Sequence, residues 1–128
     1  MGVLVVEGEE SIMKVNQSAV TYAKQLIKDG KYVVDSEWSE AQPFPAQENK
    51  YLDEHDWSEY SKWYLGTDPK EDKDTKGHYG FPYGDFKKVH RSGVIAAKQR
   101  AAQNGYDDIE KAADGLLEMI NEREGITT

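Results

Sequence analysis

Apolar residues at helical spacing mark the N-terminal part of the chain. Between residues 16 and 30 they recur every three or four positions, which is the spacing of one face of a helix. They are Ala19, Tyr22, Ala23, Leu26 and Ile27. Asn16 precedes them where a helix N-cap is expected, and Gly30 follows them where a left-handed residue ends a helix. The pattern predicts a first helix between these two residues.

The last forty residues repeat the helical pattern twice. Residues 90–105 predict an alanine-rich helix that ends at Asn104 and Gly105. Residues 106–125 predict another helix, which opens with a capping box of Asp107 and Glu110. The apolar residues of this second helix form a regular stripe: Ile109, Ala112, Ala113, Leu116, Leu117 and Ile120. Because the link between the two helices is short, they should pack antiparallel or as a corner.

Between Tyr32 and Phe86 the apolar residues are mainly aromatic. This stretch holds 12 of the 14 aromatic residues, so the middle of the core should be aromatic and its two ends aliphatic. Asp56 and Glu59 form a capping box that predicts a short helix from Asp56 onwards. Residues 63–67, "WYLGT", and 78–83, "HYGFPY", have the aromatic content of strands and predict a small hairpin.

These elements predict a mainly α fold: a small single domain of about four helices with at most a short two-stranded β-hairpin. The chain of 128 residues has the length of one domain, and we assign residues 1–128 to it. Residues 1–11, the charged loop 68–77 and residues 124–128 are expected to be flexible, because few of their side chains can join the core.

Composition excludes several classes of function. The chain has no cysteine, which rules out disulfides, thiolate zinc sites and cysteine nucleophiles. Its net charge is -8, which disfavours anionic membranes and phosphate backbones unless a local patch reverses the sign. The opening "MGVLVVEGEE" is too short for a signal sequence or a membrane span. We therefore expect a cytoplasmic protein without a membrane partner.

The motifs of catalysis and metal binding are missing from the sequence. It contains neither a nucleophile elbow, nor a Walker A loop, nor a dinucleotide fingerprint. "DKDTKG" begins like a calcium loop, but Lys76 and Tyr83 stand at ligand positions. The three histidines, His55, His78 and His90, have no chelating spacing. The sequence therefore predicts no enzymatic activity, no cofactor and no metal.

The stretch "KGHYGFPYGDFKKVHRSG", residues 76–93, combines four glycines with four aromatic residues. Pro82 should hold Phe81 in an extended conformation. Phe81 and Phe86 should pin the loop to the core, and Asp85 or Ser92 should cap the helix that follows. We interpret the stretch as a folded anchor and expect the His90 ring to be at least partly exposed.

Positive charge gathers directly after this loop. Residues 87–100 carry five basic residues and no acid, whereas residues 106–124 carry seven acids and two bases. The two helices can therefore neutralise each other across their seam, which we favour over a nucleic-acid site. A third alternative is a small-molecule or metal site near His78 and His90. The candidate binding residues are Tyr79, Tyr83, Lys87, Lys88, His90, Arg91, Lys98 and Arg100, and a pocket lined by Tyr79, Tyr83, His90 and Arg91 is the first place to search for a ligand.

The C-terminal half resembles a short domain of unknown function found in phage and prophage proteins, including some near prohead proteases. The segments that carry the resemblance are "YGFPYGDFKKVHRSGVIAAKQRAAQ" and "DIEKAADGLLEMI". The matching positions are Tyr79, Phe81, Pro82, Asp85, His90, Ala96, Ala97, Arg100, Ala101, Gln103, Ile109, Ala112, Ala113 and Leu117. The resemblance implies a small helical module attached to phage-type machinery and no reaction. We therefore expect a non-enzymatic accessory or interaction module with a protein partner, with nucleic acid as the second choice.

Overall fold

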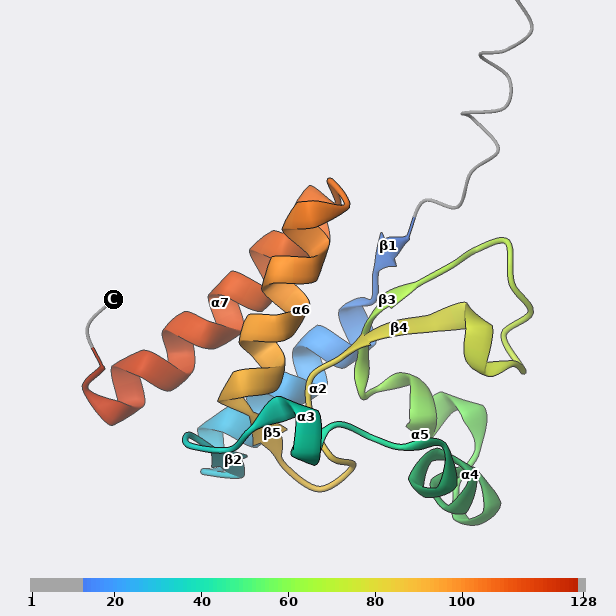
Figure 1. Ribbon diagram of the computed structural model, residues 1–128, viewed down its shortest axis with the longest axis horizontal. Helices are drawn as coiled ribbons and strands as arrows, with labels where there is room; N and C mark the ends of the chain where they lie inside the picture. Colours follow the sequence, from blue (N-terminus) through green and yellow to red (C-terminus); the bar gives the residue numbers. More distant parts are fainter. Residues whose placement is uncertain (1–12, 127–128) are drawn as a thin grey trace, which may run out of the picture.

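The fold is mixed α/β. A computed structural model describes residues 13–126, which form six α-helices, four of them of seven residues or more, and two small sheets of three and two strands (Figure 1). About 57% of the described residues are helical. The predicted mainly α fold with at most a two-stranded hairpin is therefore wrong. The expected flexibility of residues 1–11, and of the last two residues of 124–128, falls outside the described residues.

The larger sheet extends the predicted hairpin by one strand. β3 (Tyr64–Thr67) and β4 (Tyr79–Pro82) pair antiparallel, with Gly66 opposite Gly80, as the aromatic pattern predicts. β1 (Lys14–Val15) pairs with the other edge of β3, which gives the order β1-β3-β4. A strand of two residues leaves no alternation in the sequence, so β1 could not be predicted.

The smaller sheet links two segments far apart in the chain. β2 (Tyr32–Val33) and β5 (Val89–His90) lie parallel, and the Val89 amide donates to the Lys31 carbonyl at 3.1 Å. β5 leads directly into helix α6. The pairing therefore fixes the start of α6 next to the end of the first helix (Figure 1).

The three long helices match the predicted ones, although their predicted N-caps differ. They are α2 (Gln17–Lys28), α6 (Arg91–Gln103) and α7 (Asp107–Glu124). Asn16 is the N-cap of α2, but its side chain donates to the Ser61 and Tyr64 carbonyls rather than capping the helix. Tyr106, not Asp107, is the N-cap of α7, so the acids lie in the first turn and act through the helix dipole.

Three short helices and a 3-10 turn complete the chain. They are α3 (Trp38–Ala41), α4 (Pro45–Glu54), α5 (Trp57–Ser61) and η1 (Lys76–His78). The Asp56 carboxylate accepts from the Glu59 amide at 2.9 Å, which confirms the predicted cap of α5. Pro43 lies in the short connection between α3 and α4, and Pro45 occupies the first turn of α4, where proline is favoured.

The core divides as predicted. Helices α2, α6 and α7 pack against the three-stranded sheet (Figure 1). They supply the aliphatic part of the core, for example Ile27, Val94 and Ile109. The aromatic part lies around α5, β3 and the segment after β4. Its central members are the buried rings of Tyr60, Trp63, Tyr64 and Tyr83.

Phe81 joins the two parts of the core. Its side chain is only 8% exposed, and its ring meets Tyr106 edge to face at a centroid distance of 5.9 Å. The φ of Phe81 is +65°, so the extended conformation predicted from Pro82 is wrong. A left-handed φ is unfavourable by roughly 1–2 kcal/mol for a residue with a side chain. Burial of the aromatic ring offsets this cost.

Replacement of Phe81 by alanine tests its role as an anchor. We expect Phe81→Ala to lower the free energy of unfolding by about 3–5 kcal/mol, because it removes a buried aromatic ring from a packed site. Phe44 is 46% exposed, so Phe44→Ala should change the stability by less than about 0.5 kcal/mol. Urea unfolding of both variants measures the difference. Equal stability of the two variants would contradict the anchor.

Candidate functional site

Both tyrosines of the predicted site have structural roles. Tyr83 is fully buried, and its hydroxyl donates to the Lys62 carbonyl at 2.7 Å. Burial raises the pKa of the Tyr83 hydroxyl well above its ordinary value. The Tyr79 ring stacks on Trp57 at a centroid distance of 5.9 Å, and its hydroxyl donates to the Lys73 carbonyl. Neither side chain is presented to a ligand together with the other predicted residues.

The two histidines of the alternative site have separate surroundings. His90 is only 6% exposed, so the expectation of a partly exposed ring is wrong. Its neighbours are Asp85 and Ser36, whereas the Nδ1 of His78 lies 2.9 Å from the Glu71 carbonyl oxygen. Within residues 13–126, no group of three or more His, Cys, Asp or Glu side chains is placed to hold a metal ion.

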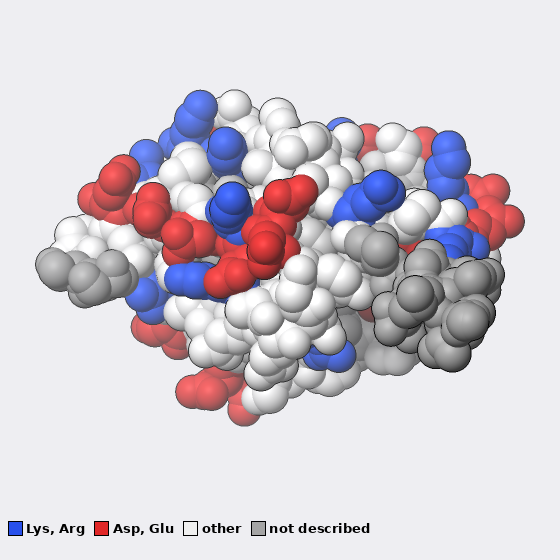
Figure 2. Space-filling model, turned by 90° about the horizontal axis from the view of Figure 1, so that it is seen from above, with Lys and Arg blue, Asp and Glu red and all other residues white. Residues whose placement is uncertain are grey.

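Two of the predicted basic residues turn towards α7. The Lys98 ammonium donates to the Asp114 carboxylate at 2.7 Å, and this hydrogen bond raises the pKa of Lys98. The Arg91 Nε donates to Asn121 at 2.9 Å. The predicted neutralisation between the two helices is therefore confirmed for Lys98. On the face shown in Figure 2, basic and acidic side chains alternate without a continuous basic area.

Lys87 and Lys88 form a turn rather than a joint site with the other basic residues. Both backbone amides donate to Oδ1 of Asp85, at 3.0 and 2.8 Å, while their side chains are exposed. Asp85 therefore closes the loop before α6. It does not cap the helix, whose N-cap is His90 without a side-chain cap, so the predicted capping by Asp85 or Ser92 is wrong.

The buried His90 ring is the centre of a chain of hydrogen bonds. Its Nε2 lies 2.9 Å from Oδ2 of Asp85, and its Nδ1 lies 2.7 Å from the Ser36 hydroxyl. The Ser36 hydroxyl is also 3.0 Å from that of Ser92. Serine, histidine and aspartate in this order are the residues of a nucleophilic triad, which in addition needs access for a substrate. Asp85 is on the rim of one cavity, but Ser36 and His90 line none of the three principal cavities of the described residues. We therefore assign a positioning role to these hydrogen-bonded side chains.

The side chain that these hydrogen bonds position is Trp38, which lies two residues after Ser36. Its ring lies over Gly93 of α6, where a Cβ atom would come within 2.6 Å of the indole, so only glycine fits beneath it. The indole also tilts against the His90 ring at a centroid distance of 6.2 Å. Close packing on Gly93 fixes the Trp38 indole against α6. The hydrogen bond between His90 and Ser36 fixes the backbone that leads to Trp38.

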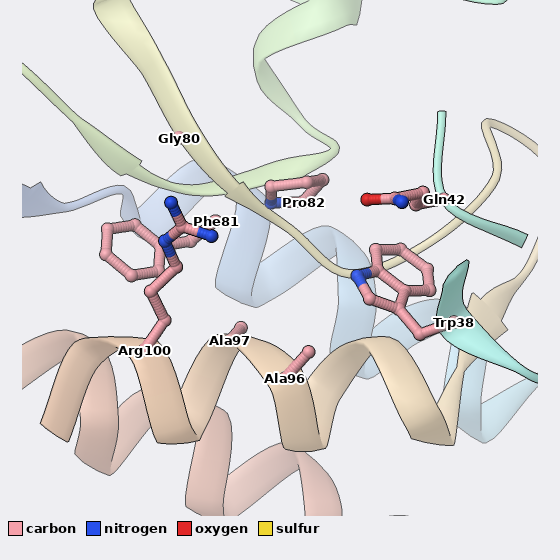
Figure 3. Close-up of a pocket in the computed structure, with 8 residues that line it drawn as sticks. All are labelled: Trp38, Gln42, Gly80, Phe81, Pro82, Ala96, Ala97 and Arg100. Carbon is pink, nitrogen blue, oxygen red and sulfur yellow. The ribbon is translucent and has the colours of Figure 1, made fainter. Parts of the chain in front are cut away.

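Trp38 closes one end of a cavity of about 400 Å³ that we call the β4–α6 groove (Figure 3). The volume is within the ordinary range of ligand sites. Residues of β4 form one wall and residues of α6 the other. The full set is Trp38, Gln42, Gly80, Phe81, Pro82, Ala96, Ala97 and Arg100. The floor is therefore apolar and built mainly from small residues.

Three polar side chains surround this apolar floor. In Figure 3 the indole nitrogen of Trp38 and the amide end of Gln42 face the groove from one end, and the guanidinium of Arg100 faces it from the other. Among the described residues, the Trp38 indole has no acceptor and the Arg100 guanidinium has no anionic partner. The groove thus offers unpaired hydrogen-bond donors beside apolar surface.

The sequence indicated only one residue of the groove. Arg100 was among the predicted binding residues, whereas Trp38 and Gln42 lie far from it in an irregular stretch. The one feature of the sequence that indicated close packing at this place was Gly93, a glycine inside an alanine-rich helix. A glycine inside a helix destabilises it unless something packs closely there.

A second cavity, of about 500 Å³, lies beside α4. Its wall is an aromatic stack in which Tyr51 lies between Phe86 and His55, with centroid distances of 4.5 and 3.9 Å. Three acids and two lysines share its rim: Glu54, Glu59, Asp85, Lys50 and Lys87. These opposite charges offset one another, so this cavity discriminates between ligands of different charge less than the β4–α6 groove does.

No family model, no curated protein and no solved structure matches the chain. Among residues 13–126, no helix has both the length and the apolar character needed to cross a membrane.

The loop before α6 should show a defined dependence on pH. Partial burial raises the pKa of Asp85, but hydrogen bonds from His90 and from the Lys88 and Lys87 amides outweigh it and lower the pKa below its ordinary value of 3.8. Ionised Asp85 therefore stabilises the fold above pH 3.8, and this contribution is lost as the pH falls through its folded-state pKa.

The substitution Asp85→Asn measures this contribution. We expect the wild type to exceed Asp85→Asn in free energy of unfolding near pH 7, and the difference to shrink as the pH falls below about 4. Asp53→Asn removes an exposed carboxylate of α4 and is the matched control, which should show little difference. A constant difference between wild type and Asp85→Asn over the whole pH range would contradict the role of the carboxylate.

Proposed function

We propose that the protein is a non-enzymatic accessory or interaction module that binds an extended segment of a partner protein in the β4–α6 groove. We place it in the cytoplasm. From the resemblance of its C-terminal half, we assign it a phage-like origin. The geometry of the groove supports the proposed binding of a partner segment.

The observation that carries the proposal is the pairing of an apolar floor with unpaired donors at both ends of the groove. Tryptophan and arginine are the residues that most often dominate the energy of protein interfaces. Trp38 is already fixed by Gly93, so binding needs little further ordering of this side chain. Small residues such as Ala96 and Ala97 leave room for the side chains of a ligand.

The wall formed by β4 favours binding through side chains rather than through strand addition. β4 lies at the edge of the sheet, where a partner strand would normally pair. However, Pro82 has no amide hydrogen to donate, and Phe81 has a positive φ that interrupts the regular edge. A bound segment therefore lies in the groove instead of extending the sheet.

Nucleic acid is the less supported partner. The predicted nucleic-acid site needed five basic residues on one surface, but Lys98 and Arg91 contact α7 and the chain as a whole carries a charge of -8. A titration with duplex DNA at low salt tests this alternative. Binding that weakens steeply with added salt would support the nucleic-acid alternative and would count against the proposed peptide site.

A selection from a displayed library of random peptides tests the proposed function. Peptides enriched on the wild-type protein should bind Ala102→Leu equally, because Ala102 is exposed on another part of α6. They should bind Ala96→Leu at least tenfold more weakly, because the added side chain fills the groove. Enrichment of peptides that bind Ala96→Leu as well as the wild type would contradict the groove as the docking site. A failure to enrich any peptide would contradict the function itself.

A further inference from the structure

Arg100 differs from the other basic residues of α6. Residues two apart on a helix point about 200° away from each other, so Lys98 faces α7 while Arg100 faces β4. Arg100 and Ala96 are four residues apart and therefore lie on the same side of the helix. The guanidinium is the one charged group that lines the groove, and no described acid neutralises it.

The length of the groove limits what it can hold. Trp38 lies over Gly93 at one end, and Arg100 lies seven residues further along α6. At a rise of about 1.5 Å per residue, this separation is roughly 10 Å. An extended chain advances about 3.3 Å per residue, so the groove spans roughly three residues of a bound segment.

The polar groups at the two ends call for different partners. The guanidinium of Arg100 matches a carboxylate, which accepts two parallel hydrogen bonds from its fork. The Trp38 indole can only donate, and the Gln42 amide can both donate and accept. A backbone carbonyl and amide of an extended segment satisfy both of these side chains. Small apolar side chains between the two ends fit the floor over Ala96 and Ala97.

We infer that the β4–α6 groove recognises an acidic segment of a partner protein, with an Asp or Glu side chain on Arg100 and small apolar residues between it and Trp38. The inference rests on the proposed function and names the chemistry of its ligand. The lining of the groove ends at Gly80 and Arg100, and Arg100 is itself exposed, so a bound chain can continue beyond the carboxylate. The acid is therefore an internal side chain rather than a chain terminus.

Short peptides of defined sequence test the inference on the full chain. The first is Gly-Glu-Ala-Val-Glu-Gly, acetylated and amidated, which places an acid at Arg100 in either direction of binding. The matched control is Gly-Gln-Ala-Val-Gln-Gly with the same caps. The signal is the indole N–H resonance of Trp38 in a ¹H–¹⁵N spectrum, which Trp38→Phe identifies among the three tryptophans.

We expect the Glu peptide to move the Trp38 resonance and to bind about tenfold more tightly than the Gln peptide, because a charged hydrogen-bonded pair is stronger than a neutral one. Arg100→Gln should abolish this preference, and Arg100→Glu should reverse it. Lys98→Gln removes a charge from the other side of α6 and should leave the preference unchanged.

Three results would overturn the inference. They are equal binding of the two peptides, an unchanged preference in Arg100→Gln, and tighter binding of Gly-Ala-Val-Ala with a free carboxyl terminus than of the Glu peptide. In each case groove-dependent peptides from the displayed library would still support the proposed function. If those peptides are acidic and their binding depends on Arg100, both the proposed function and this inference are supported.

Discussion

Packing of the Phe81 and Phe86 rings against the core fixes the path of the chain into α6. Both residues have a positive φ, +65° and +68°, which is unfavourable for any residue other than glycine. The Phe81 ring is buried and meets Tyr106 at the start of α7, and the partly buried Phe86 ring stacks on Tyr51 at a centroid distance of 4.5 Å. Burying a phenylalanine side chain contributes roughly 1.5–3 kcal/mol, which is enough to hold the backbone in this conformation.

The rest of the candidate site follows from this constraint. Between the two phenylalanines, Gly84 lets the chain turn so closely that a Cβ atom would lie 2.5 Å from the Lys88 carbonyl oxygen. The turn brings Asp85 to the His90 ring, and β5 ties His90 to β2. Ser36 binds the other side of the ring and thereby places Trp38 at the end of the groove. In the function that we propose, these hydrogen-bonded side chains act by positioning Trp38.

Regular periodicity explains which parts of the fold could be predicted. α2, α6 and α7 are long enough for apolar residues to repeat several times, and the glycines at 30 and 105 end α2 and α6 with φ of +77° and +73°. β1 and β5 have two residues each and produce no pattern. Their pairing depends on contacts between distant segments, which is why the predicted fold class omitted them.

The candidate site was less predictable than the fold. Sequence proximity grouped Tyr79, Tyr83, His90 and Arg91, but the structure buries Tyr83 and His90 and turns Arg91 to α7. Loop residues alternate between the core and the surface in ways that no period describes. Only Arg100 of the predicted residues lines the β4–α6 groove. The positive φ of Phe81 could not be predicted either, because the proline that follows it indicates an extended residue.

Native-state hydrogen exchange tests most directly whether the segment from Phe81 to His90 is a rigid anchor. The Val89 amide donates to the Lys31 carbonyl and the His90 amide to the Tyr83 carbonyl, at 3.1 and 3.0 Å. If the buried rings hold this segment, both amides exchange only through global unfolding, with the same free energy as buried amides of α2. If they exchange through a local opening several kcal/mol below that energy, the segment is mobile in the folded protein and the account is contradicted.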